Sequence, residues 1–98
     1  MIVLWNKRAH EELYAIYNYI LKKQKSPQNA VLVFNSIFDL ANSLPEFPYK
    51  YPAESLLKNP NVRYAVIWSF KIVYAIDENS IVILRVFNTN QSLAKLKK

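Results

Sequence analysis

The segment RYAVIWSFKIVYAIDENSIVILRVFN, residues Arg63–Asn88, decides the fold of this chain. It contains three short runs rich in Val, Ile, Tyr and Phe, and turn-forming residues separate the runs. Such runs are typical of β-strands, and short turns join antiparallel neighbours. The segment therefore predicts three consecutive antiparallel strands, at Val62–Trp68, Lys71–Ile76 and Ile81–Phe87.

The turns between these strands must form without glycine, because the chain contains none. We expect a tight turn around Ser69–Phe70 and a second turn at residues 77–80. Left-handed backbone positions would fall to Asn or Asp, which tolerate this conformation best after glycine. Asn79 is therefore the predicted left-handed residue. The absence of glycine also excludes a glycine-rich phosphate-binding loop.

The residues before this segment predict one more strand and two helices. Ile2–Trp5 is a short apolar strand, and Asn6 is a suitable N-cap for the helix that follows it. Ser26 and Pro27 predict the start of a second helix, which Pro45 stops. The element order β-α-α-β-β-β predicts an α+β fold, with a small antiparallel sheet and a helix hairpin packed on one face.

The composition fits a single globular domain. The chain has 98 residues, 52% of them hydrophobic, and no cysteine for disulfides or thiolate metal sites. The apolar run that ends at Asn6 is too short for a signal peptide or a membrane span. We expect residues 1–90 to form the domain and residues 91–98 a basic, flexible tail. We also expect a cytoplasmic protein without a metal, a cofactor or a membrane partner.

The net charge of +6 lies mainly in the second half of the chain. Residues 50–98 carry eight Lys and Arg against three Asp and Glu. A basic field of this kind attracts polyanions such as nucleic acids or acidic proteins, and it also keeps a small domain soluble. Charge alone leaves both interpretations open.

Three of these cations, Arg63, Lys71 and Arg85, lie on the predicted strands. Side chains alternate across a strand, so residues of the same parity share a face. We assign the bulkier sets to the face under the helices: Tyr64, Val66 and Trp68; Ile72, Tyr74 and Ile76; Val82, Leu84 and Val86. The opposite parity would place all three cations on one open, partly apolar face.

This inferred face makes Arg63, Lys71 and Arg85 the candidate residues for binding a nucleic acid or another target. The alternative is that each cation reaches water from a half-buried strand position. His10 is the only histidine and is expected to face solvent, and no carboxylates have the spacing of an acid–base or metal site. Catalysis would therefore depend on Arg, Lys and Tyr side chains, with these three cations as the candidates, and this would suit RNA cleavage through the 2′-hydroxyl.

With this order of elements, the chain resembles the RelE/ParE superfamily of type II toxins, also called plasmid stabilisation proteins. The likeness covers almost the whole chain. The long helix hairpin resembles the ParE branch more than the RelE branch. The motifs that carry it follow in order: Trp5 and Ala9 with Leu13, Ile16 and Ile20; Ser26, Pro27 and Ala30; Leu44 and Pro45; Val62 and Arg63; Phe70–Tyr74; Ile81–Gln91.

The resemblance implies a growth-inhibiting toxin that a cognate antitoxin neutralises in a hetero-oligomer. ParE-like members act on DNA gyrase, whereas RelE-like members cleave mRNA on the ribosome. Lys71 matches a basic position of the ribonuclease branch. However, residues 88–90 read Asn-Thr-Asn where ribonucleases place Lys or Arg, and no Tyr or His follows Phe87. The resemblance favours a ParE-like toxin. The alternatives are a RelE-like endonuclease and a non-toxic member that binds nucleic acid or protein.

Overall fold

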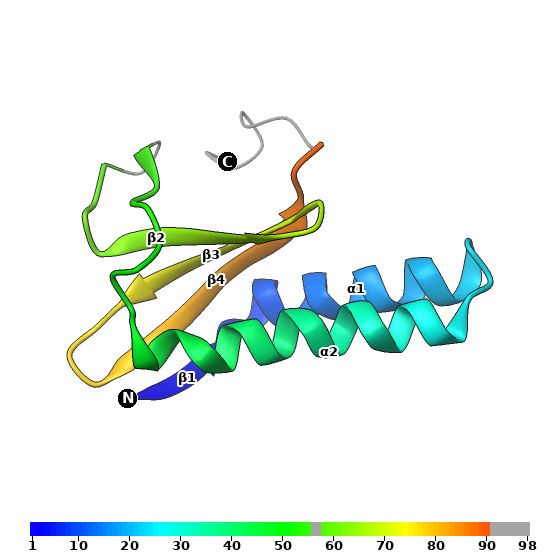
Figure 1. Cartoon of the computed structure of the whole chain (residues 1–98), viewed down its shortest axis with the longest axis horizontal. Helices are drawn as coiled ribbons and strands as arrows, with labels where there is room; N and C mark the ends of the chain where they lie inside the picture. Colours follow the sequence, from blue (N-terminus) through cyan, green and yellow to red (C-terminus); the bar gives the residue numbers. More distant parts are fainter. Residues whose placement is uncertain (56–57, 91–98) are drawn as a thin grey trace.

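A computed structural model describes residues 1–55 and 58–90 of the chain. The first strand, β1 (Ile2–Trp5), is followed by two helices, α1 (Lys7–Lys22) and α2 (Pro27–Ser43). A short 3-10 turn, η1 (Leu44–Glu46), leads into a long connection, and the chain ends in β2 (Val62–Ile67), β3 (Phe70–Ile76) and β4 (Ser80–Asn88). Figure 1 shows the sheet as one layer and the helix hairpin as the other. The predicted α+β fold is confirmed.

The strands form one four-stranded sheet in the order β1-β4-β3-β2. The last three strands pair antiparallel, as predicted, whereas β1 lies parallel to β4. Parallel neighbours need a long connection, and the helix hairpin lies within the connection between these two strands. The sheet is therefore mixed. Since β1 pairs with β4 only as far as Ile83, no strand among the described residues covers that edge of β4 beyond this residue.

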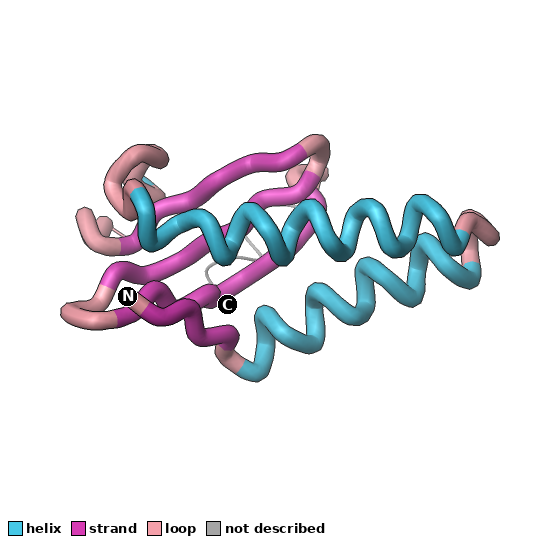
Figure 2. The backbone as a smooth tube through the Cα atoms, turned by 60° about the horizontal axis from the view of Figure 1, so that its bottom comes forward, coloured by secondary structure: helices cyan, strands magenta, loops and turns pink. Residues whose placement is uncertain are grey.

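Local capping sets the starts of both helices, as the sequence predicts. Asn6 Oδ1 accepts a hydrogen bond of 2.8 Å from the Ala9 amide, and Ser26 Oγ accepts one of 3.3 Å from the Asn29 amide. The two helices lie across one face of the sheet (Figure 2). In the described ranges, no helix is long and apolar enough to cross a membrane.

The main core fills the space between the helix hairpin and the sheet. Its buried residues are Ala9, Leu13, Ile37, Ala41, Leu44, Ile72, Tyr74, Ile76, Ile81, Ile83 and Val86. We call the opposite side of the sheet the far face. It carries a second cluster in which Val62, Val73 and Phe87 are buried. The far face is therefore partly covered, and the prediction of one open face is wrong for these positions.

The predicted faces are correct for β3 but reversed for β2. Ala65 pairs with Ile72 and Arg63 pairs with Tyr74, and both β3 partners belong to the main core. Directly paired residues share a face, so Arg63 and Ala65 lie on the helix side. Tyr64 instead packs with the cluster on the far face.

The predicted faces of β4 are only partly correct, and a β-bulge in this strand explains why. The register shifts between Val73 and Tyr74, which pair with Arg85 and Ile83, so Leu84 has no partner on β3. One extra residue inverts the alternation of a strand. Ile83 before the bulge and Val86 after it both belong to the main core, whereas Leu84 packs with the far-face cluster.

The turn between β2 and β3 is one residue earlier than predicted. Ile67 pairs with Phe70, so Trp68 and Ser69 form a two-residue loop. Trp68 has a positive φ of 51°. Among the described residues the other positive φ values belong to Lys25 and Lys58, so the prediction of a left-handed Asn79 is wrong.

The long connection after η1 covers the outer edge of β2. The Glu54 amide donates to the Val62 carbonyl at 2.8 Å, and the Tyr64 amide donates to the Pro52 carbonyl at 3.1 Å. These bonds satisfy backbone groups that an edge strand otherwise exposes. The predicted tail at residues 91–98 lies outside the described residues.

Candidate functional site

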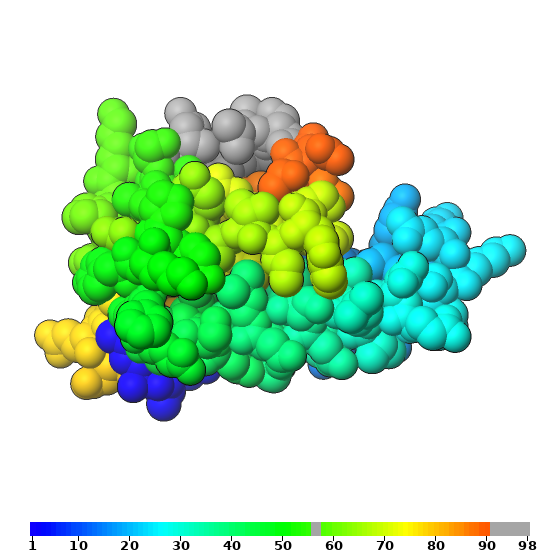
Figure 3. Space-filling view, viewed as in Figure 1, coloured from blue at the N-terminus to red at the C-terminus, as the bar shows by residue number. Residues whose placement is uncertain are grey.

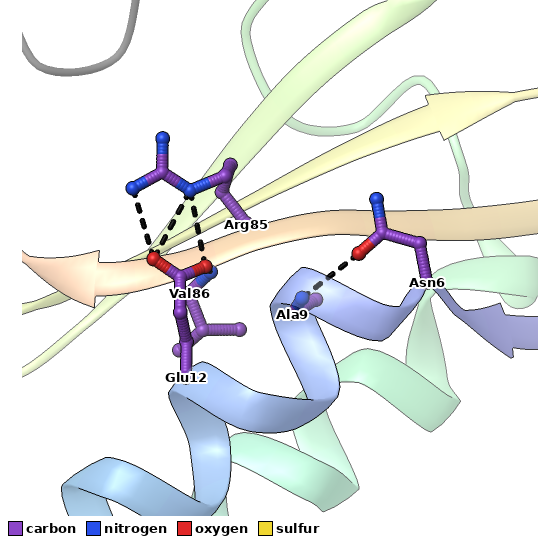
Figure 4. A network of polar contacts seen from close by, with 5 residues as sticks. All are labelled: Asn6, Ala9, Glu12, Arg85 and Val86. Atoms are coloured by element: carbon purple, nitrogen blue, oxygen red, sulfur yellow. Dashed lines mark hydrogen bonds and ion pairs between the residues drawn. The ribbon is translucent and has the colours of Figure 1, made fainter. Parts of the chain in front are cut away.

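Arg85 takes part in a polar network that joins α1 to the sheet. Its Nε lies 3.0 Å from both Glu12 carboxylate oxygens, and its Nη2 lies 2.9 Å from Oε2. The Val86 amide, at the uncovered edge of β4, donates to Glu12 Oε1 at 3.0 Å (Figure 4). Glu12 thus caps this edge and joins α1 to β4. Arg85 Nη1 is buried without a hydrogen-bond partner among the described residues.

Arg63 holds the long connection against β2. Its Nη1 donates to the carbonyls of Tyr51, at 2.8 Å, and Tyr49, at 3.3 Å, and its Nε donates to that of Pro60 at 3.1 Å. The guanidinium also lies 4.8 Å from the centre of the Tyr49 ring. Backbone carbonyls and a ring face from one segment therefore occupy this side chain.

Tyr74 holds the same connection from β3. Its side chain is fully buried, and its hydroxyl donates to the Pro48 carbonyl at 2.7 Å. Burial raises the pKa of Tyr74 to about 12, although the positive charge of Arg63 acts in the opposite direction. The phenol therefore stays protonated at neutral pH and remains a hydrogen-bond donor. We assign Tyr74 a role in fixing the connection.

Lys71 lies on the far face in an ion pair. Its Nζ is 2.6 Å from Glu54 Oε2, and the two side chains are 12% and 3% exposed. The ammonium also lies 4.2 Å from the centre of the Tyr64 ring. A buried carboxylate thus neutralises the cation that matches a basic position of the ribonuclease branch, and an aromatic ring lies against it.

The three candidate cations therefore lie in three different environments. Arg63 is on the helix side of β2, Lys71 is on the far face, and Arg85 reaches α1 at the edge of β4. They do not form the single basic face that parity predicted, because Arg63 lies on the helix side of β2 and because the Arg85 side chain pairs with Glu12 of α1. Their role in target binding stays a prediction. His10 is exposed, as expected, and its ring lies 4.8 Å from that of Tyr14.

The cations stand out in the sequence, whereas the carboxylate partners of Lys71 and Arg85 do not. Glu12 lies three residues after Ala9 and four before Ile16, so it falls within the apolar stripe of α1. A charged residue in such a stripe indicates a buried partner, and this signal could have identified it. Glu54 lies in the proline-rich connection, where no periodicity marks a residue as buried.

A groove of about 600 Å³ opens between the helix hairpin, the β2–β3 turn and the end of β4. Figure 3 shows the molecule hollowed between the end of β4 (orange) and the connection of the two helices (cyan). The residues that line the groove are Glu12, Ala15, Ile16, Tyr19, Ile20, Gln24, Asn29, Val33, Ser69, Phe70, Val86, Phe87 and Asn88. Of these described residues, only Glu12 is charged. Such a groove suits a peptide segment with apolar side chains.

A helix hairpin on a mixed sheet of this order is the fold of the RelE/ParE toxins. The chain belongs to the family described as the ParE toxin of the type II toxin–antitoxin system parDE, whose model matches residues 3–93. This match confirms the predicted superfamily and its ParE-like branch. No curated protein sequence matches the chain.

Two solved structures are similar to this chain. One is described as the chromosomal ParDE toxin–antitoxin system from P. aeruginosa, with a TM-score of 0.72, 23% identity, and coverage of 90% of this chain and 95% of that chain. The other is the toxin–antitoxin complex RelBE2 from Mycobacterium tuberculosis, with a TM-score of 0.61, 21% identity, and coverage of 89% and 88%. Both similarities show the same fold.

Proposed function

We propose that this type II toxin acts by binding DNA gyrase and that a cognate antitoxin holds it inactive in a cytoplasmic hetero-oligomer. The observation that carries the proposal is the internal pairing of Arg63, Lys71 and Arg85. Cleavage of RNA needs cations that are available to stabilise charge on the reacting phosphate. Inhibition by binding a protein needs no such group, and membership of the ParE family supports this mode of action.

The groove beside α1 is the surface that we assign to the antitoxin. It is lined mainly by apolar and uncharged polar side chains, so it suits one face of an amphipathic segment. The net charge of +6 on the toxin would attract an acidic partner and speed the encounter. The two similar structures are described as toxin–antitoxin systems, which supports a partner of this kind.

Growth and capture experiments test the neutralisation. The full chain expressed alone should arrest bacterial growth, and co-expression of the protein encoded beside it should restore growth. Tyr19→Glu should weaken capture of that protein, because Tyr19 lines the groove and is exposed enough for the change to spare folding. Phe47→Glu is the matched control, since Phe47 is also exposed but belongs to the long connection. Equal capture by both variants would contradict the groove assignment.

Two target assays separate the remaining alternatives. The purified toxin should inhibit supercoiling by DNA gyrase and should leave mRNA on translating ribosomes intact. Cleavage on the ribosome without any effect on gyrase would favour a RelE-like endonuclease. A chain that binds a partner but never slows growth would favour the non-toxic alternative.

A further inference from the structure

The turn between β2 and β3 contains an exposed residue whose backbone conformation is unusual for its type. Trp68 is the first of the two turn residues, and its φ of 51° lies in the left-handed region. A large side chain disfavours this conformation, which glycine or Asn adopts more readily. Trp68 is also 57% exposed and belongs to neither buried cluster. Neither the backbone nor the core therefore explains a tryptophan at this position.

The turn holds Trp68 in a fixed place. Ile67 and Phe70 pair directly on either side of it, and the Ser69 carbonyl accepts a hydrogen bond of 2.6 Å from the Thr89 amide. This bond ties the turn to the end of β4. Figure 1 shows that the β2–β3 turn lies at one end of the sheet and the start of the long connection at the other. A rigid tip loses little conformational entropy when a partner covers it.

The chemistry around the tip favours a protein partner over a nucleic acid. Val66, two residues before Trp68 at the end of β2, is also exposed and adds apolar surface to this hairpin. Lys71 pairs directly with Val66 across the hairpin, but its charge is neutralised by Glu54. Nucleic-acid platforms combine aromatic rings with available cations. Here the ring is present, whereas the nearest cation on the hairpin is paired.

We propose that Trp68 is the anchor through which this toxin binds an apolar pocket on its protein target. Tryptophan is the residue type most enriched among the side chains that dominate binding energy at protein interfaces. The groove is concave and suits an antitoxin segment, whereas the turn is a tip that suits a pocket in a folded protein. Unexplained backbone strain at an exposed residue is typical of functional positions. This inference rests on the proposed function, in which the toxin acts by binding a protein.

The test uses Trp68→Gly and Trp68→Asn in the full chain, because both residues tolerate a positive φ. Three quantities are measured: the thermal unfolding midpoint, growth arrest together with inhibition of gyrase supercoiling, and capture of the antitoxin. We expect a midpoint within a few degrees of the wild type or above it. The concentration for half-inhibition of gyrase should rise about 10- to 30-fold, with growth arrest lost and antitoxin capture unchanged. Phe47→Asn, which removes another exposed aromatic ring from the long connection, should change none of these.

Three other outcomes would contradict the proposal, each in a distinct way. Variants that arrest growth as the wild type does would show that Trp68 is not the anchor. A midpoint more than about 10 °C lower would indicate a structural role instead. Loss of antitoxin capture with toxicity intact would place the antitoxin, not the target, on this tip. If the wild type arrests growth without affecting gyrase, the proposed target is wrong, and growth arrest by the variants still decides the role of Trp68.

Discussion

Glu12→Gln should destabilise the fold far more than the same change at the adjacent Glu11. Glu12 makes three hydrogen-bond contacts with Arg85 and accepts one from the Val86 amide. The Arg85 and Glu12 side chains are only 12% and 21% exposed. Breaking a buried ion pair costs about 3–5 kcal/mol. Partial exposure of the pair reduces this cost, and so does the amide oxygen of the new glutamine, which can still accept a hydrogen bond. We therefore expect the free energy of unfolding to fall by about 2–3 kcal/mol.

Glu11 is the matched control, because it is an exposed neighbour of the same type. Its carboxylate lies 3.9 Å from Lys7 Nζ, and the side chains of Glu11 and Lys7 are 63% and 91% exposed. Glu11→Gln should therefore change the free energy of unfolding by no more than about 0.5 kcal/mol. Urea unfolding of both variants measures the difference. In a domain of this size, Glu12→Gln should lower the thermal midpoint by about 10–20 °C. Equal midpoints for the two variants would refute the assignment of Glu12 as the link between α1 and β4.

Further variants test three other contacts. Burial raises the pKa of Tyr74 to about 12 from 10, so its stabilising effect is complete below pH 10 and is lost as the pH rises through 12. The wild type should therefore lose about 2 kcal/mol between pH 10 and pH 12 that Tyr74→Phe does not lose, as measured by urea unfolding at each pH. Lys71→Met should cost about 3 kcal/mol, and adding Glu54→Leu should restore part of it if the buried ion pair is the cause. Asn6→Ala should cost about 1 kcal/mol through the lost N-cap, as measured in the same assay.

Local rules were sufficient where neighbouring residues decide the structure. Asn6 and Ser26 cap the helices as predicted, because capping depends on a few adjacent residues. The face of β2 was mispredicted because it was assigned by side-chain bulk, whereas pairing with β3 places Arg63 and Ala65 on the helix side. The face of β4 was mispredicted because Leu84 is the extra residue of a bulge, which carries no sequence signal.

The candidate site was predictable by residue type but not by pairing. Arg63, Lys71 and Arg85 stood out as cations within apolar strands, and all three make specific contacts in the structure. Their partners come from other elements, and Glu12 is 73 residues from Arg85 in the chain. Alternation along a strand cannot identify such a partner. The groove also depends on how α1 packs beside β4, which tertiary structure decides.

The most direct test of the proposed function is a supercoiling assay with purified DNA gyrase and the full chain, with and without its cognate antitoxin. We expect the toxin alone to inhibit supercoiling in a concentration-dependent way and equimolar antitoxin to remove the inhibition. A toxin that arrests growth but leaves gyrase fully active, while mRNA on translating ribosomes is cleaved, would show that gyrase is not its target.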